Sequence, residues 1–515
     1  MASLSVVHSL KVEDARGRGE RATARGFEAG RTGRRLRSIP TTTTAINTLI
    51  RSYGRSLLAR SRYLALNNSY AMAAREAYVS ALVGSGIKPS SLHEDKNTKK
   101  EIQKLFLDWT DEADADGLTD FFGLQTIVAG EMFEAGECFV RVRRRFAKDG
   151  LSVPIQLQLL PAEMLPTDHN EALPNGGRVE CGIEFDAIGR RAAYWFYRRH
   201  PGELLFTFDS FKGEKVRVPA DEVLHLFRPI RAGQIRGIPH TIAGIVTLAL
   251  LDLYDDAELE RKRTAALFAA FVTRNPGDKP EDNPLTGATS ESDAGTSDFT
   301  LEPGAVVDLD AGQSVVFSEP ADVGTSYEAF QYRNLLRAAA GFGVPYASMT
   351  GDMKAVNYSS IRAGLVEFRR RIEQHQHHVM VYQFCRAIWI RWFELAVLAA
   401  KLPITATAYV ANPQRERAAK WVTPKWDWVD PYKDLLAEKL AVDAGFKARS
   451  DVVEALGVDP EENDARIAQD QERADAAGIS FIRLSSSVIV APDTADDGES
   501  LVDPGNTSVD IPPSE

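Results

Sequence analysis

Hydrophobic positions in the first third of the chain repeat with the spacing of amphipathic helices. After a stretch rich in Arg, Gly, Ala and Ser over residues 1–34, apolar residues recur every three to four positions, which is the period of one helix face. Thr41–Thr44 are N-cap candidates for the first helix, and Gly84 is a stop signal for the second. The pattern predicts helices over residues 45–58, 69–82, 98–115 and 121–136.

The pattern changes to that of β-strands after residue 136. Short runs rich in β-branched and aromatic residues are separated by turn residues, as in Pro174–Gly177 and His200–Gly202. Such runs are typical of an antiparallel sheet. The expected strands are Glu137–Arg145, Ile155–Leu160, Val179–Phe185, Ala192–Tyr197 and Glu214–Val218.

Helical periodicity returns at Pro239 and continues to about Val272. The next residues, 275–299, have almost no apolar content, which is typical of a loop or a disordered tip. The elements expected after it are a hairpin over 301–317, helices over 326–341 and 359–400 with a polar loop over 344–358 between them, and two or three helices over 431–476. A helix of roughly 40 residues is far longer than the usual 11–12, so we expect it to span a large distance.

Charge is distributed unevenly over the 515 residues. Residues 1–62 hold 13 Lys and Arg against 4 Asp and Glu, a net of +9, although the whole chain has a net charge of −11. Residues 430–515 hold 20 acidic and 7 basic residues, a net of −13. Basic arms and acidic tails are common interaction segments. We therefore expect an N-terminal arm that contacts nucleic acid or an acidic partner, and an acidic body that does not hold DNA tightly.

Cysteine usage and hydropathy narrow the class of protein. Cys138, Cys181 and Cys385 cannot all pair and show no C-x-x-C spacing, which argues for a reducing compartment and against a zinc site. The most apolar run, Ile242–Tyr254, contains Asp252 and is shorter than the roughly 20 residues that span a bilayer. The first ten residues lack the long apolar core of a signal peptide. We expect neither a membrane span nor a secretory signal.

No catalytic or metal-binding motif stands out. The patterns G-x-x-x-x-G-K-[ST], G-x-S-x-G and H-E-x-x-H are absent, so no recognisable nucleotide or hydrolase site is expected. No Cys or carboxylate at ligand spacing completes a metal site around the histidine cluster, whose members are His375, His377 and His378. We expect no cofactor and no metal, and interpret the histidines as a solvated or interface face of a helix.

Three further clusters favour structural interpretations. A carboxylate-rich turn lacks the combination of glycine and glutamate that an EF-hand requires and is predicted to be a solvated helix end; it contains Asp111, Glu112, Asp114 and Asp116. Three consecutive arginines, Arg369–Arg371, point in different directions on a helix, so a salt-bridged face is at least as good an interpretation as a nucleic-acid patch. Tryptophans can stack on bases, but packing is favoured for Trp421, Trp426 and Trp428.

Five segments, taken in order, resemble the lambda-type phage portal family and extend over about residues 35–460. The patterns N-Y-S-S-x-R and G-Q-x-R-G-x-P are specific in combination, although neither alone is. The segments are Arg60–Arg62 with Asn67, Asn68 and Val83–Ile87; His225–Phe227 with Arg231–Pro239; Leu301–Gly304 with Asp310–Gln313; Gly341–Tyr346 with Gly351, Asp352 and Asn357–Arg362; and Trp426–Pro431.

The resemblance implies a non-enzymatic α+β protein, mainly helical, with the wing, stem, clip and crown of a portal and an antiparallel β region within the wing. Such proteins form dodecameric rings at one capsid vertex, nucleate head assembly, conduct DNA during packaging and ejection, and join head to tail. The implied partners are further copies of the chain, the terminase large subunit, major capsid and scaffold proteins, a head–tail adaptor, and double-stranded DNA without sequence specificity. The implied location is the virion, after assembly in the host bacterial cytoplasm.

The portal plan also assigns parts of the chain. These are a flexible basic arm (1–34), wing (35–235), first stem helix (236–273), clip (274–318), second stem helix (319–343), tunnel loop (344–358), long wing helix and return segment (359–430), crown (431–480) and disordered acidic tail (481–515). The candidates for lining the DNA channel are Asp352, Met353, Lys354 and Asn357, where Lys354 either brakes or centres DNA or is simply a solvated loop lysine. The family-motif residues with an expected structural role are Gln234, Arg236, Gly237, Pro239, Tyr358, Ser359, Ser360 and Arg362.

Two other functions are weighed against the portal. A terminase-like nuclease needs a carboxylate pair on adjacent strand ends to bind metal, and Glu137, Glu163 and Asp168 of the β region form no recognisable pattern. A different head–tail adaptor is usually much shorter and lacks the succession of stem, clip and stem. The portal is therefore the favoured function.

Overall fold

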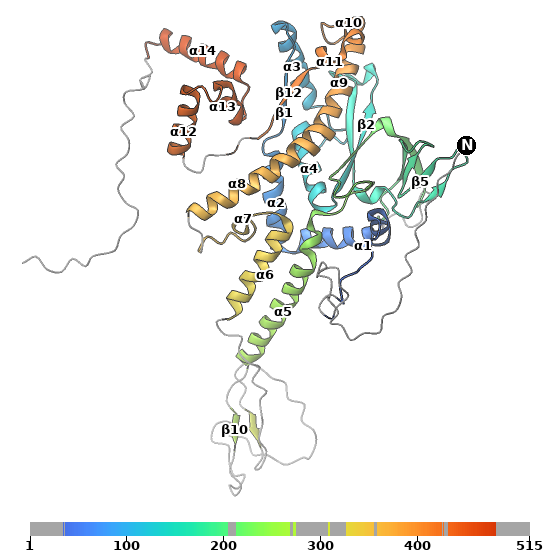
Figure 1. The fold of residues 1–515 in the computed structure, drawn as a ribbon, viewed down its shortest axis with the longest axis vertical. Helices are drawn as coiled ribbons and strands as arrows, with labels where there is room; N and C mark the ends of the chain where they lie inside the picture. Colours follow the sequence, from blue (N-terminus) through green and yellow to red (C-terminus); the bar gives the residue numbers. More distant parts are fainter. Residues whose placement is uncertain are drawn as a thin grey trace, which may run out of the picture. The chain divides into compact units, whose positions relative to one another are not determined.

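The chain begins with a group of helices that pack on one another: α1 (Ile46–Asn67), α2 (Ser69–Val83), α3 (Lys96–Thr110) and α4 (Phe121–Glu134). This computed structural model describes residues 34, 37–203, 213–267, 271–273, 307–309, 326–354, 358–424, 426 and 431–479. They divide after Pro424 into two units, each described by itself below. Figure 1 shows the course of the chain.

The predicted helices are present, with corrections at their ends. The α1 helix continues to Asn67 instead of ending at residue 58, and its N-cap is Ala45, which makes no side-chain capping bond, so the threonine caps were wrongly predicted. Asn68 separates α1 from α2 because its side-chain oxygen accepts a hydrogen bond from the Ala71 amide at 2.9 Å. Gly84, with φ of 51°, ends α2, as its freedom to adopt positive φ predicts.

The β region forms two antiparallel sheets (Figure 1). The first has the order β3 (Ile155–Leu160), β2 (Glu137–Arg144) and β9 (Val223–Phe227); the second has the order β4 (Glu171–Ala172), β5 (Arg178–Glu180), β6 (Ile183–Phe185), β7 (Arg191–Tyr197) and β8 (Lys215–Pro219). The single strand predicted over 179–185 is wrong, because Cys181 and Gly182 adopt positive φ of 50° and 79° and turn the chain between β5 and β6.

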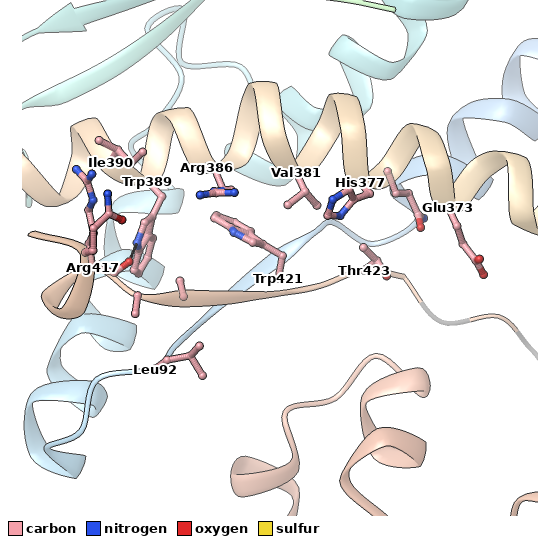
Figure 2. Close-up of a pocket in the computed structure, with 14 residues that line it drawn as sticks. Leu92, Glu373, His377, Val381, Arg386, Trp389, Ile390, Arg417, Trp421 and Thr423 are labelled. Atoms are coloured by element: carbon pink, nitrogen blue, oxygen red, sulfur yellow. Dashed lines mark hydrogen bonds between the residues drawn. The ribbon is translucent and has the colours of Figure 1, made fainter. Parts of the chain in front are cut away.

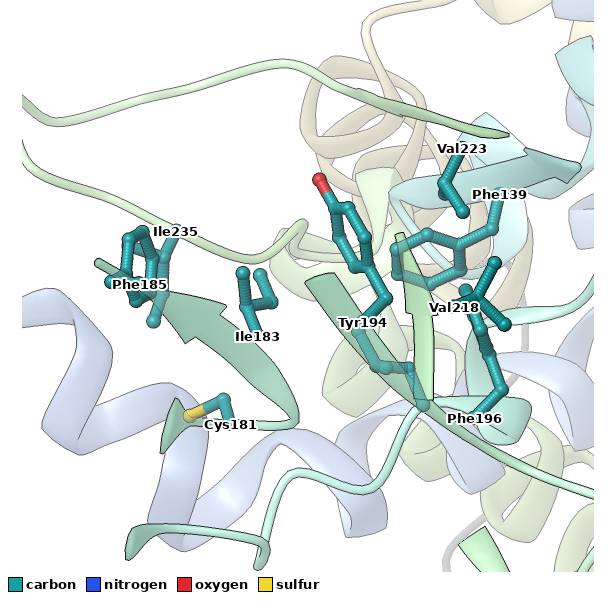
Figure 3. Close-up of a cluster of buried hydrophobic side chains, with 10 residues drawn as sticks. Phe139, Cys181, Ile183, Phe185, Tyr194, Phe196, Val218, Val223 and Ile235 are labelled. Atoms are coloured by element: carbon teal, nitrogen blue, oxygen red, sulfur yellow. The ribbon is translucent and has the colours of Figure 1, made fainter. Parts of the chain in front are cut away.

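Aromatic side chains from both sheets share one core (Figure 3). Phe139 of β2 meets Tyr194 and Phe196 of β7 with ring centroids 6.0 and 5.3 Å apart. Edge-to-face contacts of this kind stabilise a core beyond the effect of area alone. The β9 strand, which the sequence analysis missed, is buried at every position, so it lacks the alternation that marks a half-exposed strand.

Two antiparallel helices follow, α5 (Ile245–Leu267) after the short 3₁₀ turn η6 (His240–Ala243), and α6 (Ser326–Phe342). The helix predicted to reach Val272 ends earlier, because the β-favouring residues Phe271–Thr273 form strand β10. Strand β11 (Val307–Leu309) pairs with β10 in parallel, so the described part of the predicted hairpin at 301–317 is not paired within that segment. The polar segment 275–299 lies outside the described residues.

A long helix dominates the remainder of the first unit (Figure 1). It runs without interruption through α8 (Tyr358–His375), the π-helical segment η7 (Gln376–Cys385) and α9 (Arg386–Leu398), close to the bounds predicted from sequence. The polar loop predicted over 344–358 is corrected, because it contains a short helix, α7 (Tyr346–Thr350). The elements α10 (Ala406–Ala411) and α11 (Pro413–Glu416) lead to β12 (Ala419–Val422), which pairs antiparallel with β1 (Lys88–Ser91).

The α9 part of the long helix packs on an aromatic core with α3 and α4. Trp392 is fully buried and lies 5.1 Å from Phe106 and 5.2 Å from Trp389, centroid to centroid. Trp421 of β12 lies 6.2 Å from Trp389, which agrees with the packing role predicted for it. Trp428 lies outside the described residues.

The second unit contains three helices over the predicted range: α12 (Pro431–Asp443), α13 (Arg449–Ala455) and α14 (Pro460–Ala476). An ion pair of 2.7 Å between Arg449 and Asp464 connects α13 with α14. All three cysteines of the chain are free and buried. None of the helices in the described part combines the length and apolar character needed to cross a bilayer.

Candidate functional site

The loop between α7 and α8 carries the residues predicted to approach DNA. Gly351 ends α7 with φ of 71°, a conformation that a residue with a Cβ adopts only at a cost. The Asp352 carboxylate then organises the turn, since it accepts a hydrogen bond from the Lys354 amide at 2.9 Å and one from the Tyr346 hydroxyl at 3.4 Å. Met353 and Lys354 are exposed, Met353 to 60%. The loop therefore presents an apolar and a cationic side chain from a polar base.

The other predicted residues of this segment are only partly described. Asn357 lies outside the described residues. Tyr358, Ser359 and Ser360 begin α8. Arg362 is exposed on the first turns of the same helix. The loop lies at the start of the long helix, as the sequence pattern predicts.

Glutamines of the π-helical segment hold the long helix to the rest of the unit. The Gln376 side chain donates to the carbonyls of Ala81 and Leu82, at 3.2 and 3.1 Å, near the end of α2. The Gln383 amide accepts from the Phe227 amide at 3.1 Å and donates to the Phe227 carbonyl at 3.0 Å, at the end of β9. π-helical segments frequently occur at functional positions. Here the segment fixes the helix that carries the loop.

Two buried histidines contact the end of α6 and the helix α2. His240 Nε2 contacts the Phe342 carbonyl at 2.8 Å, and His375 Nδ1 contacts the Tyr78 hydroxyl at 3.2 Å. Burial lowers the pKa of His240 to about 4 and that of His375 to about 3. The interpretation of His375 as part of a solvated or interface face is therefore wrong, because the tertiary fold places it under Tyr78. Within the described residues, no group of three or more His, Cys, Asp and Glu can hold a metal ion.

The buried histidines predict that the unit loses stability in mild acid. Their folded pKa values lie below the ordinary value of about 6.5, so the unfolded chain binds protons first as the pH falls. The free energy of unfolding is expected to fall from pH 7 towards pH 5, by about 1.4 kcal/mol per histidine at pH 5.5. Urea unfolding followed by tryptophan fluorescence at pH 7.5 and 5.5 measures this. His375→Phe should reduce the difference, and the exposed control His377→Asn should leave it; equal differences in all three proteins would contradict the assignment.

The G-Q-x-R-G-x-P segment forms a buried ion pair before α5. The Arg236 guanidinium, with its side chain 3% exposed, donates to the Glu137 carboxylate at 2.6 and 2.8 Å. It also donates to the carbonyls of Leu165 and Cys181 at 3.1 and 2.9 Å. His225 Nε2 contacts the same carboxylate at 2.9 Å. Despite burial, the nearby Arg236 and His225 hold the pKa of Glu137 at about 2.

The remaining motif residues shape the backbone around this ion pair. The Gln234 side chain accepts from the Ile230 amide at 2.9 Å and donates to the Arg236 carbonyl at 2.7 Å. Gly237 donates its amide to Glu137 at 2.7 Å, and a Cβ at this position would lie 2.3 Å from the Gly136 carbonyl oxygen. Pro239 is the N-cap residue of η6. The segment thus attaches the start of α5 to both sheets.

Two of the carboxylates considered as metal ligands of a nuclease pair with arginines instead. Glu137 is neutralised by Arg236, and Glu163 pairs with Arg62 at 3.0 Å. Arg62 also pairs with Glu131 at 2.6 Å and with Glu134 at 2.8 Å. A metal-dependent nuclease needs carboxylates that are free to bind cations. These arginine pairs therefore favour a structural role for the acids of the β region.

The interpretation of the carboxylate-rich turn needs correction at Asp114. Asp114 is not on a solvated helix end: it is buried, and its carboxylate accepts from the amides of Asp116, Leu118 and Thr119 at 2.9–3.2 Å.

A groove of about 650 Å³ lies between the long helix and β12 (Figure 2). No local pattern predicted it, because its lining combines distant segments; it includes Arg386, Trp389, Arg417 and Trp421.

Two of the relatives found by comparison are portal proteins of phages. The chain is 27% identical over 424 residues to a probable portal protein of Halomonas phage phiHAP-1, covering 79% of this chain and 77% of that protein. It is 20% identical over 273 residues to portal protein B of Escherichia phage lambda, covering 50% and 51%. A chain in the neck of a native GTA particle, computed with C12 symmetry, matches with a TM-score of 0.41 and 15% identity, covering 79% of this chain and 94% of that one.

A family model described as phage portal protein, lambda family, matches residues 32–376. This range contains the buried Arg236–Glu137 pair, both helices of the α5–α6 hairpin and the loop that begins the long helix. It covers well over half of the 515 residues. The chain therefore belongs to the lambda family of phage portal proteins.

Proposed function

We propose that copies of this chain form a closed ring, most simply of twelve, at one vertex of the capsid. Membership of the portal family carries this proposal. Proteins of this family are structural, non-enzymatic components of the virion that connect head and tail, and this chain is one of them. In the proposed role the ring nucleates head assembly, docks the terminase large subunit, conducts double-stranded DNA in both directions and joins a head–tail adaptor. Assembly with capsid and scaffold proteins takes place in the host bacterial cytoplasm.

The proposed role assigns a task to each part of the described chain. The helices and sheets up to about residue 235 form the wing, and the antiparallel helices α5 and α6 form the stem. The segment 274–318 between them, of which only residues 307–309 are described, is assigned to the clip, where terminase and adaptor bind. The long helix is the main supporting helix of the wing, and the unit with α12, α13 and α14 forms the crown. The antiparallel pairing of α5 and α6 supports the assignment of the stem.

The loop before α8 is proposed to face the DNA channel. Met353 and Lys354 are exposed on a turn in which the Asp352 carboxylate accepts a hydrogen bond from the Lys354 amide. The long helix fixes the position of that turn. A conduit must not bind DNA tightly, because every neutralised phosphate adds affinity. The net charge of −11 fits this requirement. Lys354 supplies a cation with which the loop can brake or centre the duplex.

Native mass spectrometry and negative-stain electron microscopy of the purified full chain test this function. The expected result is closed rings of about twelve copies with a central opening. Monomers under all conditions, together with metal-dependent cleavage of DNA, would transfer the assignment to a nuclease. Rings that join a tail component but never bind the terminase large subunit would instead favour a different head–tail adaptor.

A further inference from the structure

A small pocket of about 180 Å³ lies where several elements of the first unit meet. Its lining comes from α2, α4, the segment after β9, the turn η6 and the long helix. Most of the lining is apolar, and the polar side chains in it are those of Tyr78, Arg228, His240 and His375. None of the described residues that line the pocket is an aspartate or a glutamate.

The His375 imidazole brings a polar atom to the pocket that the fold does not use. Its Nδ1 contacts the Tyr78 hydroxyl at 3.2 Å, and its Nε2 makes no hydrogen bond within the described residues. In the neutral tautomer that accepts from the Tyr78 hydroxyl, the proton lies on Nε2. Because His375 is only 9% exposed, this N–H is costly without an acceptor. The pocket therefore favours a ligand that accepts hydrogen bonds.

Two arginines bring positive charge to the same place. Arg228 lines the pocket, and neither it nor Arg371 of α8 has an ion-pair partner within the described residues. A Cβ on Gly343 would lie 3.5 Å from the His240 Nε2 and 3.6 Å from a terminal nitrogen of Arg371, so Arg371 reaches the histidine that lines the pocket. Beyond the effect of burial, both arginines lower the pKa of His240 and His375. Their charges therefore act on the pocket.

This combination of groups matches a small oxyanion. Guanidinium groups bind carboxylates and phosphates through paired hydrogen bonds, and a phosphate has enough oxygens to accept from two arginines and an imidazole together. The apolar remainder of the lining lowers the local dielectric, which strengthens attraction between opposite charges. A pocket of about 180 Å³ has room for such an ion with some water, whereas it cannot admit a DNA duplex.

We propose that this pocket binds one small oxyanion of the phosphate class per chain. Arg228 and Arg371 neutralise the ion, and the His375 Nε2 donates a hydrogen bond to it. The His240 Nε2 already donates to the Phe342 carbonyl at the end of α6, so the ion lies where the start of α5 and the end of α6 meet the long helix. It links these helices to the one that carries the 351–354 loop. The site is formed by one chain and does not depend on the ring.

Calorimetric titration of the full chain with inorganic phosphate, at constant ionic strength set by chloride, tests the site. One phosphate per chain is expected. Arg228→Leu and Arg371→Leu should each weaken binding at least tenfold, because each removes a charge-assisted hydrogen bond. Arg370→Leu is the matched control, since Arg370 is exposed on the same helix and points about 100° away from Arg371; it should keep the affinity. Equal affinity in all four proteins, or no binding at all, would overturn the proposal.

Thermal unfolding gives an independent measurement. A ligand that binds the folded chain raises its melting temperature, so phosphate should raise that of the unmodified chain more than that of Arg228→Leu. The comparison is needed because phosphate stabilises proteins in general. In chloride alone the two proteins should melt together, since Arg228 is exposed, which shows that the variant folds. An equal rise in both proteins would contradict the site. Acetate that binds as tightly as phosphate would also contradict it, because the pocket would then select a carboxylate.

Discussion

Replacing Arg236 with leucine is expected to lower the free energy of unfolding by about 3–5 kcal/mol. The substitution leaves the Glu137 carboxylate buried without its guanidinium partner, and also leaves the carbonyls of Leu165 and Cys181 without their donor. Removing one member of a buried ion pair costs more than the pair itself contributes, because an uncompensated charge remains in a medium of low dielectric. Urea unfolding at pH 7.5 measures the loss.

Two further variants show whether the ion pair is the cause. The double variant Arg236→Leu with Glu137→Leu removes both charges and should recover part of the lost stability. Arg198→Leu breaks the exposed pair with Glu214, whose atoms are 3.2 Å apart, and should cost no more than about 1 kcal/mol. If Arg236→Leu proves no more harmful than Arg198→Leu, the motif does not anchor α5 in the way described.

The second large effect is expected from Trp392→Ala, which should cost about 3–5 kcal/mol. Trp392 is fully buried between the long helix and α3, in contact with Phe106 and Trp389. Truncation leaves a cavity that the neighbouring rings cannot fill. Because this contact holds the α9 part of the long helix, the loss should also loosen the element that positions the 351–354 loop. Thermal unfolding followed by circular dichroism provides the measurement.

Trp392→Phe separates packing from polar effects. The indole Nε1 of Trp392 is buried and has no hydrogen-bond partner within the described residues, so its removal sacrifices no bond. Phenylalanine retains most of the ring contacts and should cost less than about 1.5 kcal/mol. Leu398→Ala, at a position on the same helix that is 73% exposed, should be close to neutral. A loss from Trp392→Phe as large as that from Trp392→Ala would contradict the packing argument.

Local patterns predicted the elements that depend on local signals. The glycine stop at Gly84 and the apolar period of α2, α4 and α6 are properties of neighbouring residues. The long helix was predicted in the same way, from the length of the helical segment 359–400. The break between β5 and β6 was missed because Cys181 adopts positive φ, which side chains other than glycine seldom do. The β1–β12 pair was also beyond reach, since its strands are separated by over three hundred residues.

The candidate site was predicted in part for the same reason. Arg236 was singled out by its motif, but its partner Glu137 is 99 residues away in sequence and was instead considered as a nuclease carboxylate. His375 was placed on a solvated or interface face because nothing near it in sequence indicates Tyr78.

A cryo-electron microscopy reconstruction of the assembled ring tests the central claim most directly. The account predicts a closed ring in which Met353 and Lys354 of every copy point towards the axis, near the narrowest part of the channel. A ring whose 351–354 loops lie on the outer surface, or a chain that forms no ring at all, would contradict it.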